Sequence, residues 1–235
     1  MRAAIVIPVY NHGPQVTEVI AAARLLGLPI FVVDDGSTDA TAAVLAAQEE
    51  IVVLRHPANR GKGAALLTGF AAAASTCDWA LTIDADGQHD PEDGRGLLAA
   101  AAARQDARVL VVGRRRGMRG GHVPWTSRFG RGFSNFWVWV SGGPLIADSQ
   151  SGFRLYPLPE TLGLGVAARR YQFEVEVLVR ARRRGIAIVE VPVSVVYQPK
   201  GIRVSHFRPW LDFCRNTGTF CRLICSRVFR LGRRR

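Results

Sequence analysis

The first half of the chain alternates short apolar runs with longer stretches in which apolar residues recur every three or four positions. The runs are rich in β-branched residues and predict strands at Ala3–Val9, Ile30–Asp34, Ile51–Arg55, Trp79–Asp84 and Arg108–Gly113. The stretches between them predict helices at Gln15–Leu26, Ala40–Glu49, Gly63–Ala74 and Gly94–Arg104. This alternation indicates βαβ units, so we expect an α/β, Rossmann-like fold with a mostly parallel sheet flanked by helices.

The alternation stops after Gly113. A basic, glycine-rich stretch at 114–135 leads into aromatic residues at 133–140, which suit either contact with lipid or a core helix. Further along, the pattern predicts a helix over Phe173–Arg184 and a strand over Ala187–Pro192.

The last segment, 205–231, has the periodicity of an amphipathic helix. Its apolar face consists of Phe207, Trp210, Leu211, Cys214, Thr217, Cys221, Ile224, Cys225 and Val228. Arg208, Arg215 and Arg222 recur every seventh residue on the other face, where Leu223 is the one large apolar residue. Such a helix suits an anionic bilayer surface or the core of its own domain, and its arginines favour the bilayer surface.

The composition is that of a chain able to form one full core, because 48% of its 235 residues are hydrophobic. The net charge is +12, and from Lys200 to the end ten basic residues stand against one acid. We therefore expect a domain at 1–200 and a basic membrane-surface tail at 201–235. Four cysteines without a disulfide framework, no signal peptide and no long apolar run suggest a cytoplasmic protein, peripheral on the inner face of the cell membrane.

A sequence pI near 10.8 also fits a nucleic-acid-binding protein. Against this alternative, the basic residues of the tail lie opposite an apolar face, and acidic residues at strand ends would repel phosphate. We therefore expect no nucleic-acid partner.

Two acidic clusters follow predicted strands, at Asp34-Asp35-Gly36-Ser37 and at Asp84-Ala85-Asp86-Gly87-Gln88. The carboxyl ends of parallel strands meet at one edge of a sheet, so both clusters are expected in one site. Each cluster alone also fits a capping turn or chance occurrence. Together they favour a divalent cation, Mg²⁺ or Mn²⁺, held by Asp86 and Gln88 and binding a diphosphate.

Four segments in this order resemble the family 2 inverting glycosyltransferases of the GT-A fold: residues 8–11, 32–39, 59–63 and 84–88. Residues 86–91 and 151–154 resemble, within that family, the branch of dolichyl-phosphate mannosyltransferase and polyprenyl-phosphate sugar transferases. The resemblance covers Ile5 to about Tyr197. It implies a metal-dependent hexosyltransferase that moves a sugar from a UDP- or GDP-linked donor to a polyprenyl phosphate or related lipid acceptor.

Carried over by position, the resemblance implies that the nucleotide-sugar donor is bound by Pro8, Tyr10, Asn11, Asp34, Asp35, Ser37, Lys62, Asp84, Ala85 and Asp86. Asp34 would contact the base or ribose, Asp84 would face the donor, and Asp86 with Gln88 would bind the metal. His12 departs from the family, which usually has an acid at this position.

The acceptor decides what else the site needs. A lipid phosphate is already anionic and needs a cationic cradle, for which Arg114, Arg128 and Arg131, with Ser134, are the candidates. A carbohydrate or lipid hydroxyl would need a base, and Asp148 is the best-placed carboxylate. Glu174 and Glu176 are weaker candidates because their spacing places them on different helix faces. The catalytic candidates are therefore Asp84, Asp148, Arg114, Arg128 and Arg131.

Two further interpretations fit less well. A nucleotidyltransferase usually has a glycine-rich, basic loop after its first strand, which this chain lacks. A catalytically inactive relative is disfavoured because Asp84-Ala85-Asp86 is intact.

Overall fold

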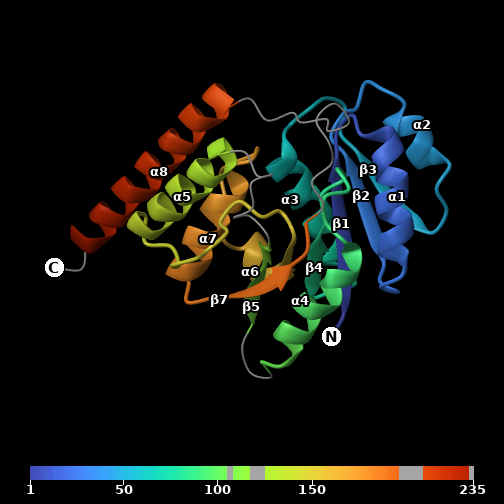
Figure 1. Ribbon diagram of the computed structural model, residues 1–235. Coiled ribbons are helices and arrows are strands. Elements are labelled where there is room, and N and C mark those ends of the chain that lie inside the picture. The colour runs from blue at the N-terminus through green and yellow to red at the C-terminus, as the bar shows by residue number, and fades with distance from the viewer. Residues whose placement is uncertain (105–107, 117–124, 196–208, 233–235) are drawn as a thin grey trace.

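The structure is a computed structural model that describes residues 1–104, 108–116, 125–195 and 209–232 (Figure 1). Within these ranges, the side chains of 125–128, 209–212 and 230–232 are not described. The strands are β1 (Ala3–Val9), β2 (Ile30–Asp34), β3 (Ile51–Arg55), β4 (Trp79–Thr82), β5 (Val109–Arg115), β6 (Arg154–Pro157) and β7 (Ala187–Val193). The helices are α1 (Gly13–Arg24), α2 (Thr41–Ala46), α3 (Lys62–Ala73), the 3₁₀ turn η1 (Pro91–Asp93), α4 (Gly94–Ala102), α5 (Trp125–Val140), α6 (Leu158–Leu162), α7 (Phe173–Arg183) and α8 (Pro209–Gly232).

The strands form one mixed sheet in the order β3-β2-β1-β4-β6-β5-β7. β3, β2, β1 and β4 run parallel, β7 runs parallel to β5, and β6 is antiparallel to both β4 and β5. The predicted α/β class and mostly parallel sheet are confirmed. β6 was not predicted, because four buried residues have no alternation that would reveal a strand.

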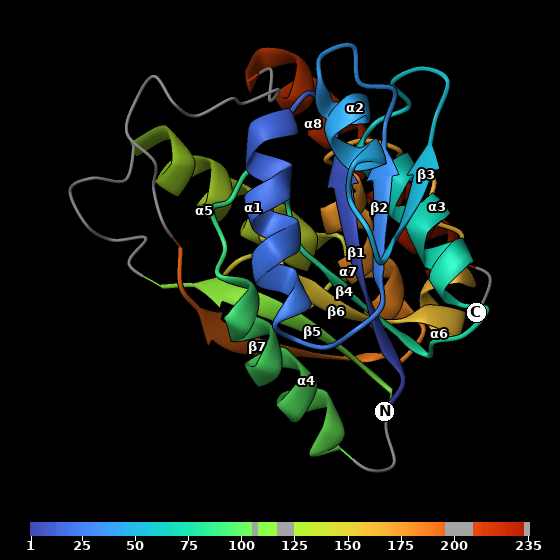
Figure 2. The same cartoon turned by 90° about the vertical axis from the view of Figure 1, so that its right-hand side faces the viewer.

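Helices cover both faces of the sheet (Figure 2). Successive strand side chains point to opposite faces, so Ile5 and Ile7 pack in the cluster that includes α1 and α4, whereas Ala4 and Val6 pack with α3 and α7. Both faces of β1 and β2 are therefore buried, as expected for parallel strands covered by helices on both sides.

α5 and α8 form an outer layer over α7, and they run side by side in Figure 1. The predicted C-terminal helix is present from Pro209, while residues 205–208 and the predicted domain boundary near 200 lie outside the described residues. Along the described part of the chain, no helix is both long and apolar enough to cross a membrane.

The face through which α8 docks on the domain is not the apolar face that the sequence pattern identified. The helix packs on the domain through Thr219, Phe220 and Leu223, and Leu223 is only 2% exposed. The predicted apolar face points outward instead: Cys214, Cys221 and Cys225 are exposed, and Val228 is 61% exposed. Phe207, Trp210 and Leu211 of that face are not among the described side chains.

Polar contacts explain this orientation. Arg222 of α8 pairs with the buried Glu176 of α7 at 2.8 Å. Arg183 of α7 donates to Ser226 Oγ at 2.8 Å and to the carbonyl of Leu223 at 2.6 Å. These charge-assisted hydrogen bonds hold the arginine-bearing flank of α8 against the domain.

Candidate functional site

The first acidic cluster forms a tight turn at the end of β2. Asp34 is fully buried, and its Oδ1 accepts from the backbone N–H of Ser37 at 2.8 Å. The Ser37 hydroxyl in turn accepts from the N–H of Asn11, which follows β1, at 3.0 Å. The cluster therefore forms the expected Asx turn, but this turn does not cap α2, whose N-cap residue is Ala40 and has no side-chain cap hydrogen bond. The same contacts also bring two neighbouring strand ends together.

The second carboxylate of this turn, Asp35, faces the loop before α3. It accepts from the N–H groups of Arg60 at 2.9 Å and Gly61 at 2.7 Å. His56 Nδ1 lies 2.7 Å from Asp35 Oδ1, and its Nε2 lies 2.9 Å from Thr68 Oγ1. Asp35 thus fixes the loop that directly precedes Lys62. Its effect on the site is therefore indirect, through the position of that loop.

Lys62, the first residue of α3, lies between two carboxylates. Its Nζ is 2.7 Å from Asp84 Oδ1 and 2.5 Å from Glu174 Oε1 of α7. Burial alone lowers the pKa of Lys62, but the charges of Asp84 and Glu174 outweigh it and raise that pKa well above its usual range. Lys62 therefore stays charged and neutralises Asp84. Glu174 was expected only as a weak candidate base.

Asp84 and Asp86 follow β4, which ends at Thr82, two residues before the predicted end. Burial raises the pKa of Asp84, but the charge of Lys62 reverses this and lowers it overall. The pKa of Asp86 is raised, first by burial and then by the charge of Asp84. Among the described contacts no basic side chain touches Asp86, so its charge calls for a cation from outside.

The surroundings of Asp86 suit a hard divalent cation. Asp86 Oδ1 accepts from the backbone N–H of Gln88 at 3.1 Å, so the two residues share one turn. The side-chain nitrogens Gln88 Nε2 and His89 Nδ1 are buried without a hydrogen-bond partner. In the described part of the chain, no three His, Cys, Asp or Glu side chains form a closed metal site. Carboxylate and amide oxygens at an open position are the ligands Mg²⁺ and Mn²⁺ use when a substrate phosphate completes their shell.

The segment 151–154 forms the wall opposite Asp84. A Cβ at Gly152 would collide with Asp84 Oδ2 and Lys62 Nζ, so a side chain here would have to displace this ion pair. Arg154 is fully buried and donates to the carbonyls of Ser149, Ser151 and Glu174, each between 2.7 and 2.8 Å. The Ser151-Gly152-Phe153-Arg154 motif is thus the scaffold that holds this wall close to the carboxylates.

Arg115, which the sequence reasoning missed, faces this site. Its Nε and Nη2 donate to Asp148 Oδ2 and Oδ1 at 2.7 and 2.8 Å. Burial raises the pKa of Asp148, but the hydrogen bonds and charge of Arg115 lower it overall. β5 continues two residues past its predicted end, so the alternation along the strand turns Arg115 inward, whereas Arg114 is exposed.

The other acceptor candidates lie on α5. Arg131 is half-buried and close enough for its charge to lower the pKa of Asp148, after the effects of burial and Arg115. Ser134 is buried and shares a 2.9 Å hydrogen bond with Ser149. The side chain of Arg128 lies outside the described residues.

The remaining donor candidates lie at the same edge of the sheet. Pro8 is buried near the end of β1, Tyr10 directly follows that strand, and Ala85 is buried between the two aspartates. Glu176, two residues from Glu174, points away from the site. It accepts from the N–H groups of Ala167 and Ala168 and from Arg180.

The sequence of this chain is similar to one protein family and to several of its members. The sequence model of Glycosyl transferase family 2 matches residues 4–158. Polyprenol monophosphomannose synthase of Mycolicibacterium smegmatis is 31% identical over 226 residues, covering 86% of this chain and 80% of that protein. Undecaprenyl-phosphate mannosyltransferase of Micrococcus luteus is 30% identical over 213 residues, covering 86% of each chain. UDP-N-acetylglucosamine–dolichyl-phosphate N-acetylglucosaminyltransferase of Methanococcus voltae is 29% identical over 215 residues, covering 82% of this chain and 85% of that protein.

Solved structures show the same fold. Glucosyl-3-phosphoglycerate synthase of Mycobacterium tuberculosis, in complex with phosphoglyceric acid, superimposes with a TM-score of 0.71 at 22% identity, covering 94% of this chain and 79% of that one. A complex of the same enzyme with Mn²⁺, uridine diphosphate and glucosyl-3-phosphoglycerate superimposes with a TM-score of 0.69.

Proposed function

The chain belongs to Glycosyl transferase family 2, and on that premise we propose that it transfers a sugar from a nucleoside diphosphate sugar to a polyprenyl phosphate. The nucleoside diphosphate would lie at the carboxyl ends of β1, β2 and β4, between the Asp34 turn and Asp84. Asp86 and Gln88 would hold Mg²⁺ or Mn²⁺ there. When bound, that cation supplies charge neutralisation for the diphosphate leaving group.

The observation that carries the choice of acceptor is the pairing of Arg115 with Asp148. Arg115 engages both carboxylate oxygens of Asp148, and a third contact comes from the Arg115 backbone N–H at 3.3 Å. Glu174 is also paired with a cation, since its Oε1 lies 2.5 Å from Lys62 Nζ. Neither carboxylate is therefore disposed to take a proton from a hydroxyl. A phosphate acceptor needs no base, which supports it over the rival hydroxyl acceptor.

The proposed reaction is a single in-line displacement. A phosphate oxygen of the lipid forms a bond to the anomeric carbon of the sugar. The bond from that carbon to the β-phosphate oxygen breaks, and the nucleoside diphosphate leaves with the electron pair. No proton has to be removed, and the anomeric configuration inverts. Arg115 and Arg131 would supply the positive field that orients the acceptor phosphate.

The protein would bind the lipid acceptor at the membrane, which it would contact through α5 and α8. Phe136 and Trp139 of α5 are each 53% exposed, and Val228 of α8 is 61% exposed. Aromatic rings that project from a basic chain suit the interface of an anionic bilayer. Because the donor is a nucleotide sugar, we place the reaction on the cytoplasmic face of the membrane.

The test is the release of nucleoside diphosphate from a panel of UDP- and GDP-sugars with Mn²⁺, with and without a short polyprenyl phosphate. We expect release to require the lipid phosphate and to identify the donor. Release that occurs with a sugar hydroxyl acceptor but not with the lipid phosphate would overturn the proposal.

A further inference from the structure

A network of buried contacts links the end of β2 to α3, the helix that begins with Lys62. Asp35 Oδ1 lies 2.7 Å from His56 Nδ1, and His56 Nε2 lies 2.9 Å from the hydroxyl of Thr68 on α3. We propose that His56 is a positioning residue, which through Asp35 holds the Lys62 ammonium against Asp84. Its effect on turnover rests on the proposed function, whereas its effect on the position of Lys62 does not.

Asp35 is a buried carboxylate, so the protein has to supply the donors for its oxygens. It is 3% exposed, and its Oδ1 and Oδ2 accept from the backbone N–H groups of Arg60 at 2.9 Å and Gly61 at 2.7 Å. His56, which is 4% exposed, adds a side-chain contact to Oδ1. Because a carboxylate only accepts hydrogen bonds, the proton of this contact is on His56 Nδ1, and Nε2 faces the Thr68 hydroxyl.

His56 is itself held by two rigid elements. It directly follows β3, and its backbone N–H donates to the carbonyl of Asp34 on β2 at 2.9 Å. Its imidazole reaches Thr68, which lies on α3 six residues after Lys62, about 9 Å along the helix axis. The network therefore fixes α3 to the end of the sheet at a second point, in addition to the contact between Asp35 and the start of the helix.

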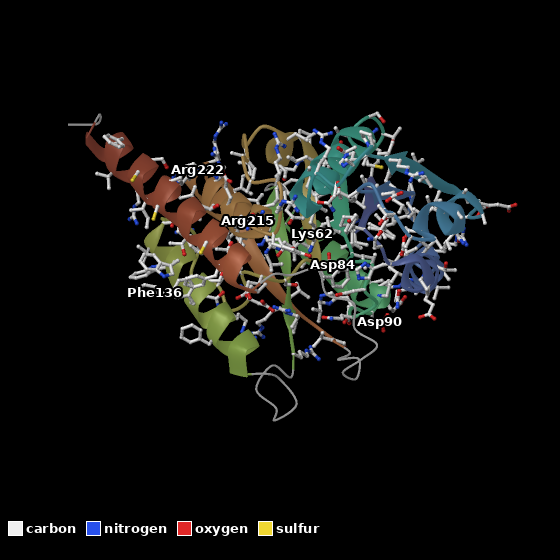
Figure 3. All side chains as sticks on the ribbon, turned by 90° about the horizontal axis from the view of Figure 1, so that it is seen from above. Lys62, Asp84, Asp90, Phe136, Arg215 and Arg222 are labelled. Carbon is white, nitrogen blue, oxygen red and sulfur yellow. The ribbon has the colours of Figure 1, made fainter. Side chains whose placement is uncertain are left out.

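The loop that Asp35 holds decides where Lys62 lies. Gly61 has a φ of 99°, which favours glycine, and a Cβ here would collide with the carbonyl of Arg169. Lys62 follows directly, and its ammonium lies 2.7 Å from Asp84 Oδ1; the two side chains lie side by side in Figure 3. A displacement of Asp35 would therefore reach Lys62 through one intervening residue, Gly61.

The surroundings of the Lys62 ammonium leave little room for such a displacement. Its Nζ also lies 2.5 Å from Glu174 Oε1, and a Cβ at Gly152 would lie 2.6 Å from it. A misplacement of about 1 Å in an active site can lower the rate about 10²-fold. Loss of the contact between His56 and Asp35 is therefore expected to be felt at Asp84.

The position of Lys62 can be measured directly, because lysine is rare in this chain. Lys62 and Lys200 are its two lysines, so the NMR spectrum of protein labelled with ¹³C-lysine holds two sets of side-chain signals. The variant Lys200→Arg assigns them. The signal of Lys62 depends on the carboxylates around its ammonium, and the measurement needs neither donor nor acceptor.

Two variants of His56 separate the two contacts of the imidazole. The amide nitrogen of asparagine takes the place of Nδ1 and keeps a donor for Asp35, whereas that of glutamine takes the place of Nε2 and faces Thr68. We expect His56→Asn to keep the wild-type Lys62 signal and a turnover within about twofold of wild type. His56→Gln should move the signal and lower kcat by at least about tenfold.

Each variant is the matched control of the other, since a role in stability alone would affect both. Equal losses in the two variants, or an unmoved Lys62 signal in His56→Gln, would overturn the proposal. If His56→Gln does not fold, His56→Asn decides: an unmoved Lys62 signal supports the role through Asp35, and a displaced one contradicts it. A wild-type chain that transfers no sugar would overturn the proposed function, while the Lys62 signals would still decide the role of His56.

Discussion

The Lys62 ammonium contacts both carboxylate oxygens of Asp84, at 2.7 and 2.9 Å, and it also contacts Glu174 at 2.5 Å. One cation therefore balances two carboxylates that lie 22 and 112 residues away in the sequence. Asp86 has no such partner among the described contacts, and under the proposed function its charge would be balanced by the divalent cation that accompanies the donor.

Replacing Asp86 should abolish metal-dependent turnover without unfolding the chain. In Asp86→Asn a neutral amide replaces the half-buried carboxylate that would hold the cation, and the loss should be about 10²–10³-fold in kcat, as for other groups that stabilise charge in a transition state. The measurement is nucleoside diphosphate release against Mn²⁺ concentration. Glu18→Gln, which changes an exposed acid on α1, is the control and should retain full activity.

Removing the charge of Lys62 should destabilise the fold. Lys62→Met leaves Asp84 and Glu174 close together without a cation, and breaking a largely buried ion pair costs about 3–5 kcal/mol. The free energy of unfolding in urea measures this loss. The double variant Lys62→Met/Glu174→Gln should recover part of it, since one of the two stranded carboxylates is then neutral. No recovery would mean that the two residues are not coupled.

Adding one methyl group at Gly152 should impair activity more than stability. The new Cβ collides with Asp84 and Lys62 and has to displace them from their contacts. We expect Gly152→Ala to lower kcat by at least about tenfold, because such sites tolerate little misplacement. Gly130→Ala on α5, where a Cβ meets nothing within 4 Å, is the matched control. Similar rates in both variants would contradict the placement of this wall.

Asp148 should act by positioning Arg115 and not as a base. If Asp148 were the catalytic base, Asp148→Asn would lower activity as much as Asp86→Asn does. The substitution would also remove the acid limb of the pH–rate profile. We expect a smaller loss, about tenfold, which is not additive with Arg115→Gln because the two side chains act as one unit. An intact profile in Asp148→Asn would agree with this role.

The same pair makes a contribution to acid stability. Asp148 has a lower pKa in the folded chain than in the unfolded one, where it is near 3.8. Its contribution is therefore present above about pH 4 and is lost as the pH falls through the folded pKa. Acid unfolding monitored by circular dichroism should begin at a higher pH in Arg115→Gln than in wild type. An unchanged midpoint would show that the pair does not stabilise the fold.

Exposed aromatic residues on α5 should contribute to vesicle binding. In Phe136→Glu/Trp139→Glu, two half-exposed rings become carboxylates, which an anionic bilayer repels. We expect vesicle binding to fall by at least about tenfold while turnover of a short, water-soluble acceptor stays within about twofold. Leu25→Glu, at the exposed end of α1, is the control. Parallel losses of binding and turnover would contradict a separate membrane surface. Deleting α8 is a poorer test, because the helix contributes Phe220 and Leu223 to the hydrophobic core.

The sequence by itself determined the βαβ half of the fold and the family. Strand and helix periods are local properties, so β1 to β4 and the helices between them could be predicted from runs of a few residues. The two acidic clusters could be assigned to one site for the same reason, since parallel strands with short connections bring their carboxyl ends together.

Only the tertiary structure decided how the second half completes the site. The antiparallel strand β6 and the contact between Lys62 and Glu174 depend on chain reversals that no local period encodes. Arg115 rather than Arg114 faces the site because β5 continues for two residues beyond the apolar run that ends at Gly113. The docked face of α8 was decided by ion pairs with α7, since Glu176 and Arg222 must meet when both are brought to one interface. Hydrophobic pattern alone identified the apolar face but could not tell which face docks, because it does not register which charges a neighbouring element presents.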